Sequence, residues 1–301
     1  MKLAEPSGRS TADGLLFAVM CLIWGTTWVA AKLGVEAIPP ILFSALRYAL
    51  VGAGLLLTVP GIPALLRGPL GLRVAGTGLL VNAGTYSLLF WGIQFVASGV
   101  AGLVNMSLIV IGLYALALLR GEERASWRHA LALVLGTGGL VALFYDRAGF
   151  GGGATEAWGL LAIILGSFCY CFGSVLSRPL LRHATPLQLT GAQALSGTAG
   201  LFLLSLLLEP VSMEPFAALL RPVPLASLLF MVICGTFIAY SIYLRLMDRW
   251  GSARAGLYAF VSPVVALLLG AVAFGEALGP RQILGAVLML GAAGLALKRP
   301  G

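Results

Sequence analysis

The chain has 301 residues, of which 59% are hydrophobic and only 10% carry a formal charge, whereas soluble domains are about 25% charged. Its 11 acidic and 19 basic side chains are too few to solvate a globular surface of this size, which excludes an ordinary water-soluble enzyme and a disordered chain. The net charge of +8 does not indicate a nucleic-acid partner, because the basic residues stand singly or in small groups between apolar runs.

Long stretches without a formal charge delimit the expected membrane segments. They cover residues 14–31, 48–66, 74–119, 129–145, 157–177, 184–208, 222–244, 255–275 and 282–297. A helix needs about 20 apolar residues to cross the hydrocarbon core, so each run predicts one helix, except 74–119, which is long enough for two with a turn at 97–99. The first run resembles a signal peptide but lacks a small-residue cleavage site, so we expect it to be retained. The sequence therefore predicts an all-α polytopic membrane protein with ten transmembrane helices.

Basic residues are distributed unevenly between the two sets of connections. With a cytoplasmic N-terminus, only Lys32, Arg147, Arg221 and Arg281 fall outside, and most of the others fall inside. Cytoplasmic loops carry an excess of Lys and Arg, so we expect both termini in the cytoplasm. The excess of Arg over Lys and the frequent Ala and Gly are typical of a GC-rich bacterial genome, which suggests a bacterial inner membrane.

The second half of the chain repeats features of the first half in the same order. The matching segments are Gly84-Thr85 with Gly235-Thr236, Ser98 with Ser252, Gly102 with Gly256, and Gly121-Glu122 with Gly275-Glu276. We expect a cytoplasmic tail over 1–12 and five-helix repeats over 13–147 and 156–298. Because five is odd, the second repeat must be inverted relative to the first. Inverted repeats are typical of secondary transporters, which bind substrate near the midplane between the repeats.

Further segments carry a resemblance to a known family. They are Trp24-Gly25-Thr26-Thr27-Trp28, Arg47-Tyr48, the block from Ser252 to Glu276 that contains Pro263, and the last helix from Gly285 to Gly294. With the ten helices in two halves, they resemble the EamA-like family of the drug/metabolite transporter superfamily, most of all the YddG-type exporters of aromatic and other amino acids. The resemblance implies a small-molecule carrier. The chain departs from the repeat at Ile109, which stands opposite Pro263, so the halves need not bend alike.

No acidic residue lies in the middle of a predicted span. The acidic residues fall near helix ends or, like Asp248, in connections. The first helix is also similar to that of small multidrug exporters, but their essential Glu, three residues before Gly-Thr-Thr, is Leu22 here. Carboxylates within spans are the usual proton relays, and the remaining candidates, Cys and Tyr, have reference pKa values of about 8.5 and about 10. We therefore expect transport without obligatory proton coupling.

Neutral polar and aromatic side chains recur within the spans, several at helical spacing. The candidate substrate-binding residues are Trp24, Trp28, Asn82, Tyr86, Asn105, Tyr170, Gln193, Tyr240 and Tyr258. A buried amide in lipid needs either a partner on a neighbouring helix or a wet cavity, and the sequence leaves both open. A lining without fixed charge suits a zwitterion such as an amino acid, because aromatic faces attract its ammonium group. We expect Arg47 to extend toward the outer interface, the alternative being contact with a substrate carboxylate.

Other functions are less well supported. A nucleotide-sugar or sugar-phosphate carrier needs several cations near the midplane, where only Lys32 and Arg47 are candidates, and a related drug transporter or a non-transporting scaffold is a further alternative. No Ser/His, paired-Asp or His-Glu-x-x-His arrangement lies within the spans, so we expect no enzyme, metal or cofactor. The expected partners are a small-molecule substrate, such as an amino acid or related metabolite, and the lipid bilayer.

Small residues are frequent in two of the predicted helices. They are Gly136, Gly138 and Gly139 in the fifth and Gly285, Gly291 and Gly294 in the tenth. Small residues let membrane helices approach closely, so we expect these helices to pack within one chain. A homodimer interface is the alternative, and the sequence leaves monomer or homodimer open.

Overall fold

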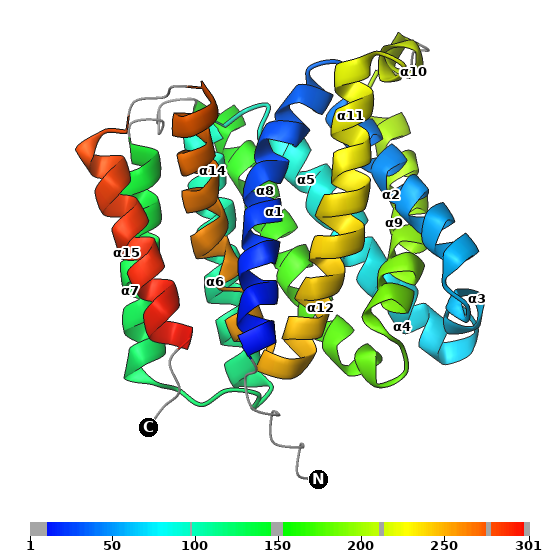
Figure 1. Cartoon of the computed structure of the whole chain (residues 1–301). Helices are drawn as coiled ribbons and strands as arrows, with labels where there is room; N and C mark the ends of the chain where they lie inside the picture. The colour runs from blue at the N-terminus through cyan, green and yellow to red at the C-terminus, as the bar shows by residue number, and fades with distance from the viewer. Residues whose placement is uncertain (1–10, 97, 146–152, 211–213, 275–277, 298–301) are drawn as a thin grey trace.

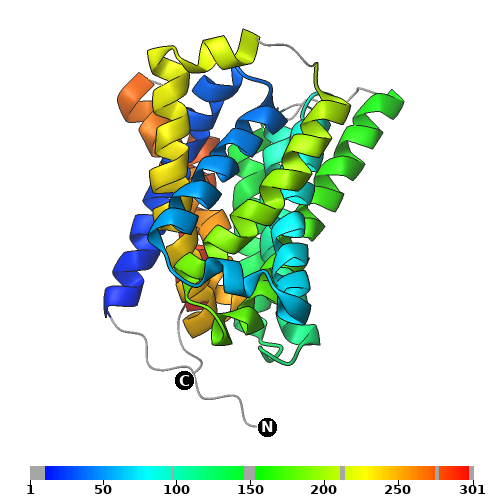
Figure 2. The same cartoon turned by 90° about the vertical axis from the view of Figure 1, so that its right-hand side faces the viewer.

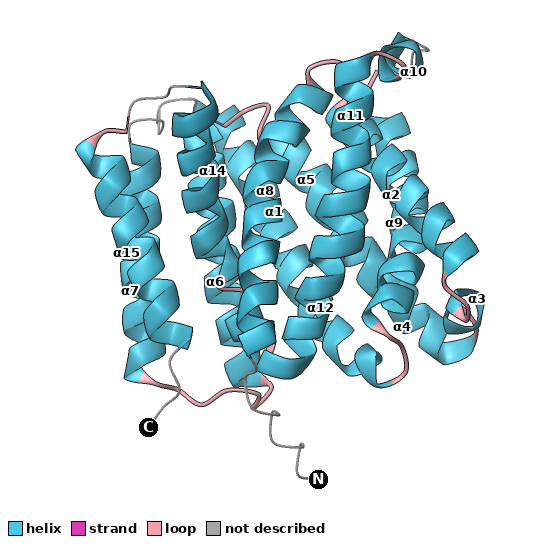
Figure 3. Ribbon diagram, viewed as in Figure 1, coloured by secondary structure: helices cyan, strands magenta, loops and turns pink. Residues whose placement is uncertain are grey.

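The computed structural model describes residues 11–96, 98–145, 153–210, 214–274 and 278–297. These residues form helices joined by short turns, and the described part of the chain contains no strand (Figure 3). The helices of the first half are α1 (Thr11–Val35), α2 (Pro40–Thr58), α3 (Ile62–Leu65), α4 (Gly68–Gly78), η1 (Leu79–Gly84), α5 (Thr85–Gly92), α6 (Ser98–Leu119) and α7 (Trp127–Phe144). Those of the second half are α8 (Gly153–Ser177), η3 (Arg178–Arg182), α9 (Pro186–Leu208), α10 (Glu214–Leu219), α11 (Pro222–Phe230), η4 (Met231–Ile238), α12 (Ala239–Trp250), α13 (Ser252–Ala255), α14 (Tyr258–Phe274) and α15 (Pro280–Leu297).

Each half supplies five segments long enough to span a membrane. Among the described residues, 9 helical segments meet the criteria of both length and apolarity. A tenth segment is formed by α4, η1 and α5, which follow one another without a break from Gly68 to Gly92. The turn predicted at 97–99 was wrong in position: a turn occupies residues 93–96, Ala97 is outside the described residues, and Ser98 and Gly99 already belong to α6. The polytopic all-helical fold predicted from the sequence is confirmed.

Helix ends extend beyond the charge-free runs. Asp248, predicted to lie in a connection, is part of α12, which continues to Trp250 and carries Arg249 in its last turn. The prediction was wrong because a helix does not have to end where its apolar run ends. Backbone hydrogen bonds continue past the apolar run, and a cation near the helix C-terminus interacts favourably with the helix dipole.

The spanning segments stand side by side and pack across the two halves. Figures 1 and 2 show the start of α1 and the end of α15 at the same end of the molecule, which we call the terminal face. Helix α1 packs against α11, α12 and α14, while α2 packs along α9 and α7 along α15. Since each of these pairs joins the first half to the second, the two halves are interleaved and share one core.

The repeat seen in the sequence recurs as a pair of π-helices. Within the third spanning segment of its half, η1 ends at Gly84, and η4 contains Gly235-Thr236. Thr85 Oγ1 donates to the carbonyl of Leu80 at 3.0 Å, and Thr236 Oγ1 donates to the carbonyl of Met231 at 3.1 Å, in both cases five residues back. A π-turn is rare and is often found at functional sites, so its occurrence at matching positions draws attention to the space beside both threonines.

Glycine brings α7 and α15 into close contact within the chain. A Cβ atom built on Gly139 would lie 2.8 Å from the carbonyl oxygen of Gly285, and one on Gly285 would lie 2.7 Å from that of Gly139. A Cβ on Gly136 would meet the ring of Phe260. In contrast, Gly138, Gly291 and Gly294 have no heavy atom within 4 Å of such a Cβ. Only part of the predicted small-residue surface therefore serves packing within the chain.

We expect Gly139→Ala to lower the thermal stability of the purified protein. Its methyl group would lie 2.6 Å from Met289 Cγ as well as against the Gly285 carbonyl, and such overpacking costs about 1–3 kcal/mol. The matched control is Gly138→Ala, whose methyl group meets open space and which should leave the melting temperature equal or higher, since Ala favours a helix. Equal melting temperatures for the two variants would contradict the close packing of α7 and α15.

Candidate functional site

A cavity of about 170 Å³ lies between the two halves. One water needs only about 10–15 Å³ on this measure, so there is room for several waters or a small molecule. The lining comes from both halves: Trp24, Thr27, Ala31, Phe43, Ser44, Arg47, Tyr48, Val81, Thr85, Tyr86, Leu89, Phe90, Asn105, Met106 and Ile109 from the first, and Tyr170, Met231, Gly235, Tyr240, Tyr258 and Ser262 from the second.

The cavity extends from the middle of the bundle toward the end opposite the terminal face. Helix α2 begins at that opposite end (Figure 1) and contributes Phe43, Ser44, Arg47 and Tyr48 from its first half. Helix α1 begins at the terminal face and contributes nothing before Trp24. The lining is therefore displaced from the terminal face.

The structure brings most of the predicted site residues together. Lining the cavity are Trp24, Tyr86, Asn105, Tyr170, Tyr240 and Tyr258. Asn82 and Gln193 are not among the lining residues, and the side chain of Trp28 is outside the described part of the structure. Sequence reasoning missed the contribution of Tyr48, Thr27 and Ser44, although Tyr48 follows Arg47 in a segment that it had singled out.

Aromatic rings form the side of the cavity that faces the terminal face. The ring centroids of Trp24 and Tyr258 are 4.3 Å apart, and Tyr243 lies 5.5 Å from Trp24 and 5.7 Å from Tyr258. The hydroxyl of Tyr258 donates to that of Tyr170 at 2.8 Å. Trp24 Nε1 donates to the carbonyl of Gly235 in η4 at 3.0 Å. This aromatic floor, which also includes Tyr240, joins α1 of the first half to α8, η4, α12 and α14 of the second.

Gln193, which does not line the cavity, hydrogen-bonds Tyr240 of the aromatic floor. Its side chain, 0% exposed, accepts a hydrogen bond from the Tyr240 hydroxyl at 2.9 Å. Its Nε2 donates to Thr77 Oγ1 at 2.8 Å and to Ser177 Oγ at 2.6 Å. Asn82 Nδ2 donates to the backbone carbonyl of Gln193 at 3.0 Å. Both amides therefore bond neighbouring helices, one of the two arrangements that the sequence left open, and they position the lining without being part of it.

Arg47 is buried inside the bundle, with 5% of its surface exposed. Its Nε donates to Thr236 Oγ1 at 2.8 Å, and its guanidinium carbon lies 5.1 Å from the ring centroid of Tyr48 and 5.8 Å from that of Tyr86. The expectation that it extends toward the outer interface was wrong. Residue 47 shares the inward face of α2 with Phe43 and Ser44, and a residue on this face points at the cavity rather than at lipid.

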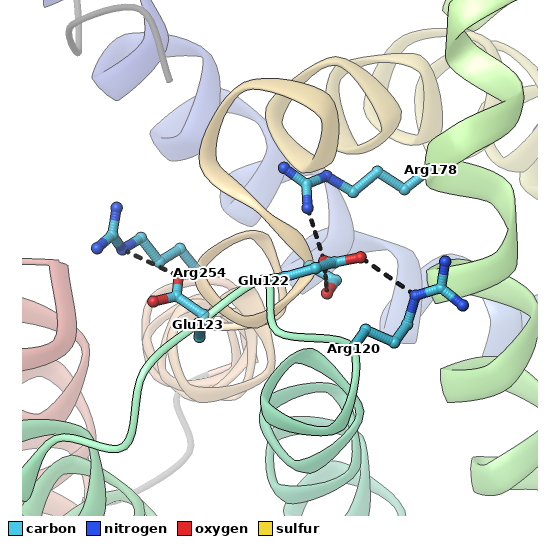
Figure 4. A network of polar contacts seen from close by, with 6 residues as sticks. Arg120, Glu122, Glu123, Arg178 and Arg254 are labelled. Atoms are coloured by element: carbon cyan, nitrogen blue, oxygen red, sulfur yellow. Dashed lines mark hydrogen bonds and ion pairs between the residues drawn. The ribbon is translucent and has the colours of Figure 1, made fainter. Parts of the chain in front are cut away.

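Ion pairs tie the two halves together at the terminal face (Figure 4). Glu122 Oε2 lies 2.7 Å from Arg178 Nη1 and accepts a hydrogen bond from Ser252 Oγ at 3.2 Å. Glu123 Oε1 lies 3.6 Å from Arg254 Nε.

Asp13 and Arg249 form another such pair, with Arg249 Nη1 donating to Asp13 Oδ1 at 2.9 Å. In each pair the acid belongs to the first half and the base to the second. Together with Glu122–Arg178 and Glu123–Arg254, this contact links the two halves at the terminal face.

A glycine with a left-handed backbone conformation precedes Glu122 and places it among these ion pairs. Gly121 has φ of +67°, which favours glycine and ends α6. The backbone N–H of Glu122 then returns to the carbonyl of Ala117 at 2.8 Å, as in a helix C-cap. The Gly-Glu pair noted in the sequence thus has a structural meaning in the first half, while Gly275-Glu276 lies outside the described residues.

Comparison with known proteins places the chain among membrane transporters. The model of the EamA-like transporter family matches residues 13–145 and 157–298. A "Probable amino-acid metabolite efflux pump" of Salmonella typhimurium is 27% identical over 93% of this chain and 93% of the relative, and one of Escherichia coli strain K12 is 26% identical with the same coverage.

Two further matches cover nearly the same length. "Uncharacterized inner membrane transporter YedA" of Escherichia coli strain K12 is 30% identical over 88% of this chain and 83% of the relative. One solved crystal structure matches with a TM-score of 0.78 at 26% identity, covering 96% of this chain and 97% of the other.

Proposed function

We propose that this chain, which belongs to the EamA-like transporter family, exports amino acids or related small metabolites across a bacterial inner membrane. The observation that carries the proposal is the cavity between the halves, whose lining combines aromatic rings, an amide and hydroxyls. Aromatic faces attract an ammonium group, and hydroxyl and amide groups hydrogen-bond polar ligand atoms. The names of two relatives as efflux pumps point in the same direction.

Export then proceeds by alternating access of this cavity to the two sides of the membrane. The terminal face carries Arg178, Arg249 and Arg254, and cytoplasmic ends of membrane proteins are rich in Arg and Lys, so we assign the terminal face to the cytoplasm. In the arrangement described, the ion pairs and the aromatic floor separate the cavity from the cytoplasm. Substrate enters after these contacts part and leaves toward the opposite end after they form again.

The proposal is tested with purified protein in liposomes loaded with unlabelled amino acid. Labelled amino acids from a panel of aromatic and aliphatic members should accumulate by counterflow. Tyr86→Ala should weaken this flux about threefold or more, because one substrate contact is worth about 0.5–1.5 kcal/mol. The control is Phe172→Ala, which should leave the flux unchanged. Phe172 lies on α8, is 48% exposed and does not line the cavity. A protein that carries none of the panel would contradict the proposal.

Counterflow should not require a proton gradient. Within the described lining, no side chain is a carboxylate or an imidazole, the groups that usually relay protons in membrane carriers. A proton-coupled carrier needs a group that binds a proton in one state and releases it in the other. Flux at equal internal and external pH, unaffected by a protonophore, is therefore expected, and flux that appears only with an imposed pH gradient would overturn this prediction.

A further inference from the structure

Among the described residues, the lining of the cavity includes one charged group, and no ion pair found there neutralises it. Arg47 is the charged member of the described lining, and none of the ion pairs found among the described residues includes it. A guanidinium does not lose its proton in proteins, so the charge is present throughout any transport cycle. Buried charges are normally paired or solvated, and here the space in front of the charge is the cavity itself.

The protein fixes this guanidinium and leaves one edge of it free. Nε is engaged by Thr236 Oγ1, which itself donates to the Met231 carbonyl within η4. The rings of Tyr48 and Tyr86 lie on the guanidinium at 5.1 Å and 5.8 Å. No acceptor among the described residues bonds Nη1 or Nη2. The two Nη groups form a fork that matches the two oxygens of a carboxylate.

We propose that Arg47 binds the carboxylate of the transported substrate through Nη1 and Nη2 and thereby restricts this carrier to ligands that bear a carboxylate. The inference rests on the proposed function in that substrate must enter this cavity. Thr236 acts as a positioning residue, because by holding Nε it leaves the Nη fork as the edge available to the ligand. The aromatic floor then receives the ammonium and side chain of an amino acid.

The test compares ligands that lack either the carboxylate or the ammonium group of an amino acid. Dissociation constants are measured on purified protein for phenylalanine, phenylalaninamide and phenylethylamine, and for 2-oxo acids and N-acetyl amino acids as carboxylates that lack an ammonium group. The wild-type protein should bind phenylalanine at least tenfold more tightly than the amide or the amine. Arg47→Gln should abolish this preference by weakening phenylalanine at least tenfold, with the amide unchanged or improved.

Two further variants separate recognition from folding. Arg47→Lys keeps the charge but lacks the fork, so it should retain part of the preference for the acid, and Thr236→Val should reduce the preference while the charge remains. Arg221→Gln removes an exposed Arg at the start of α11 and should change none of the constants. Melting temperatures without ligand show whether each variant is folded. If Arg47→Gln is not folded, the preference of Arg47→Lys for the acid over the amide decides whether Arg47 binds the carboxylate.

The outcomes distinguish the inference from the proposed function. Binding of 2-oxo acids but not amino acids, lost in Arg47→Gln, would refute amino-acid transport and support the role of Arg47. Equal losses for phenylalanine and its amide in Arg47→Gln would overturn the role of Arg47 while leaving amino-acid transport intact. A wild-type protein that binds the amide and the amine as tightly as the acid would also overturn the inference.

Discussion

Replacing Glu122 by Gln should open the terminal face of the resting protein. The carboxylate, 8% exposed, lies 2.7 Å from Arg178 Nη1 and accepts from Ser252, so it makes two contacts to the second half at once. A hydrogen bond to a charged group contributes about 1.5–3 kcal/mol, which corresponds to roughly a 10- to 150-fold change in an equilibrium constant. This is enough to shift the balance between closed and open forms of the terminal face.

The shift is measurable as a distance between spin labels across that face. Arg124→Cys in the first half and His183→Cys in the second are exposed positions for the labels, in a background whose 4 cysteines are replaced by Ala. Glu122→Gln should add a population at longer distance. Arg120→Gln is the matched control, because Arg120 contacts Glu122 at 3.4 Å from within the same half. An unchanged distribution in Glu122→Gln would contradict the closing role of the cluster.

Gln193→Met should destabilise the protein more than any other exchange of one polar side chain on α9. The substitution keeps the volume but removes the acceptor of the Tyr240 hydroxyl and the donor to Thr77 and Ser177. An orphaned buried hydroxyl costs about 1–3 kcal/mol, and each lost bond between membrane helices adds about 0.6 kcal/mol. Transport should fall as well, since Tyr240 lines the cavity.

The control for Gln193→Met is a substitution of another polar residue of α9. Thr198 Oγ1 donates to the carbonyl of Ala194 within α9 at 2.7 Å, so Thr198→Ala should lower the melting temperature in detergent much less than Gln193→Met. Melting temperatures that fall equally in both variants would show that the bonds of Gln193 to α4, α8 and α12 do not hold these helices together.

Helical spacing in the sequence identified much of the cavity but could not separate its lining from its support. Tyr86, Tyr170 and Tyr258 each share a helix face with a polar side chain in the sequence, and all three line the cavity. Gln193 stands out in the sequence as a single amide within a span, yet it lies behind the lining, bonded to Tyr240. Spacing shows which residues share a face, but not which helix packs against it. That depends on contacts such as α2 with α9 and η1 with α9, which join residues far apart in the chain.

The same limit explains what was missed. Arg47 sits on the buried stripe of α2 with Phe43 and Tyr48, a pattern visible in the sequence, but an isolated Arg near a helix start is also what an interfacial residue looks like. Glu122 and Glu123 were visible as acids after a span, whereas their partners, Arg178 and Arg254, follow in the second half. The number of spans was predictable because charged side chains are rare within membrane-spanning helices, and Arg47 in α2 is buried inside the bundle.

The most direct test of the central claim is to lock the terminal face and measure transport. Glu123→Cys and Arg254→Cys replace one of the ion pairs between the halves in the background without native cysteines. A short, reducible bifunctional thiol reagent then joins the connection between α6 and α7 to α13 at the terminal face. Alternating access predicts that cross-linking abolishes amino-acid counterflow in liposomes and that reduction restores it, while each single-cysteine protein is unaffected by the reagent. Undiminished flux through fully cross-linked protein would contradict the account.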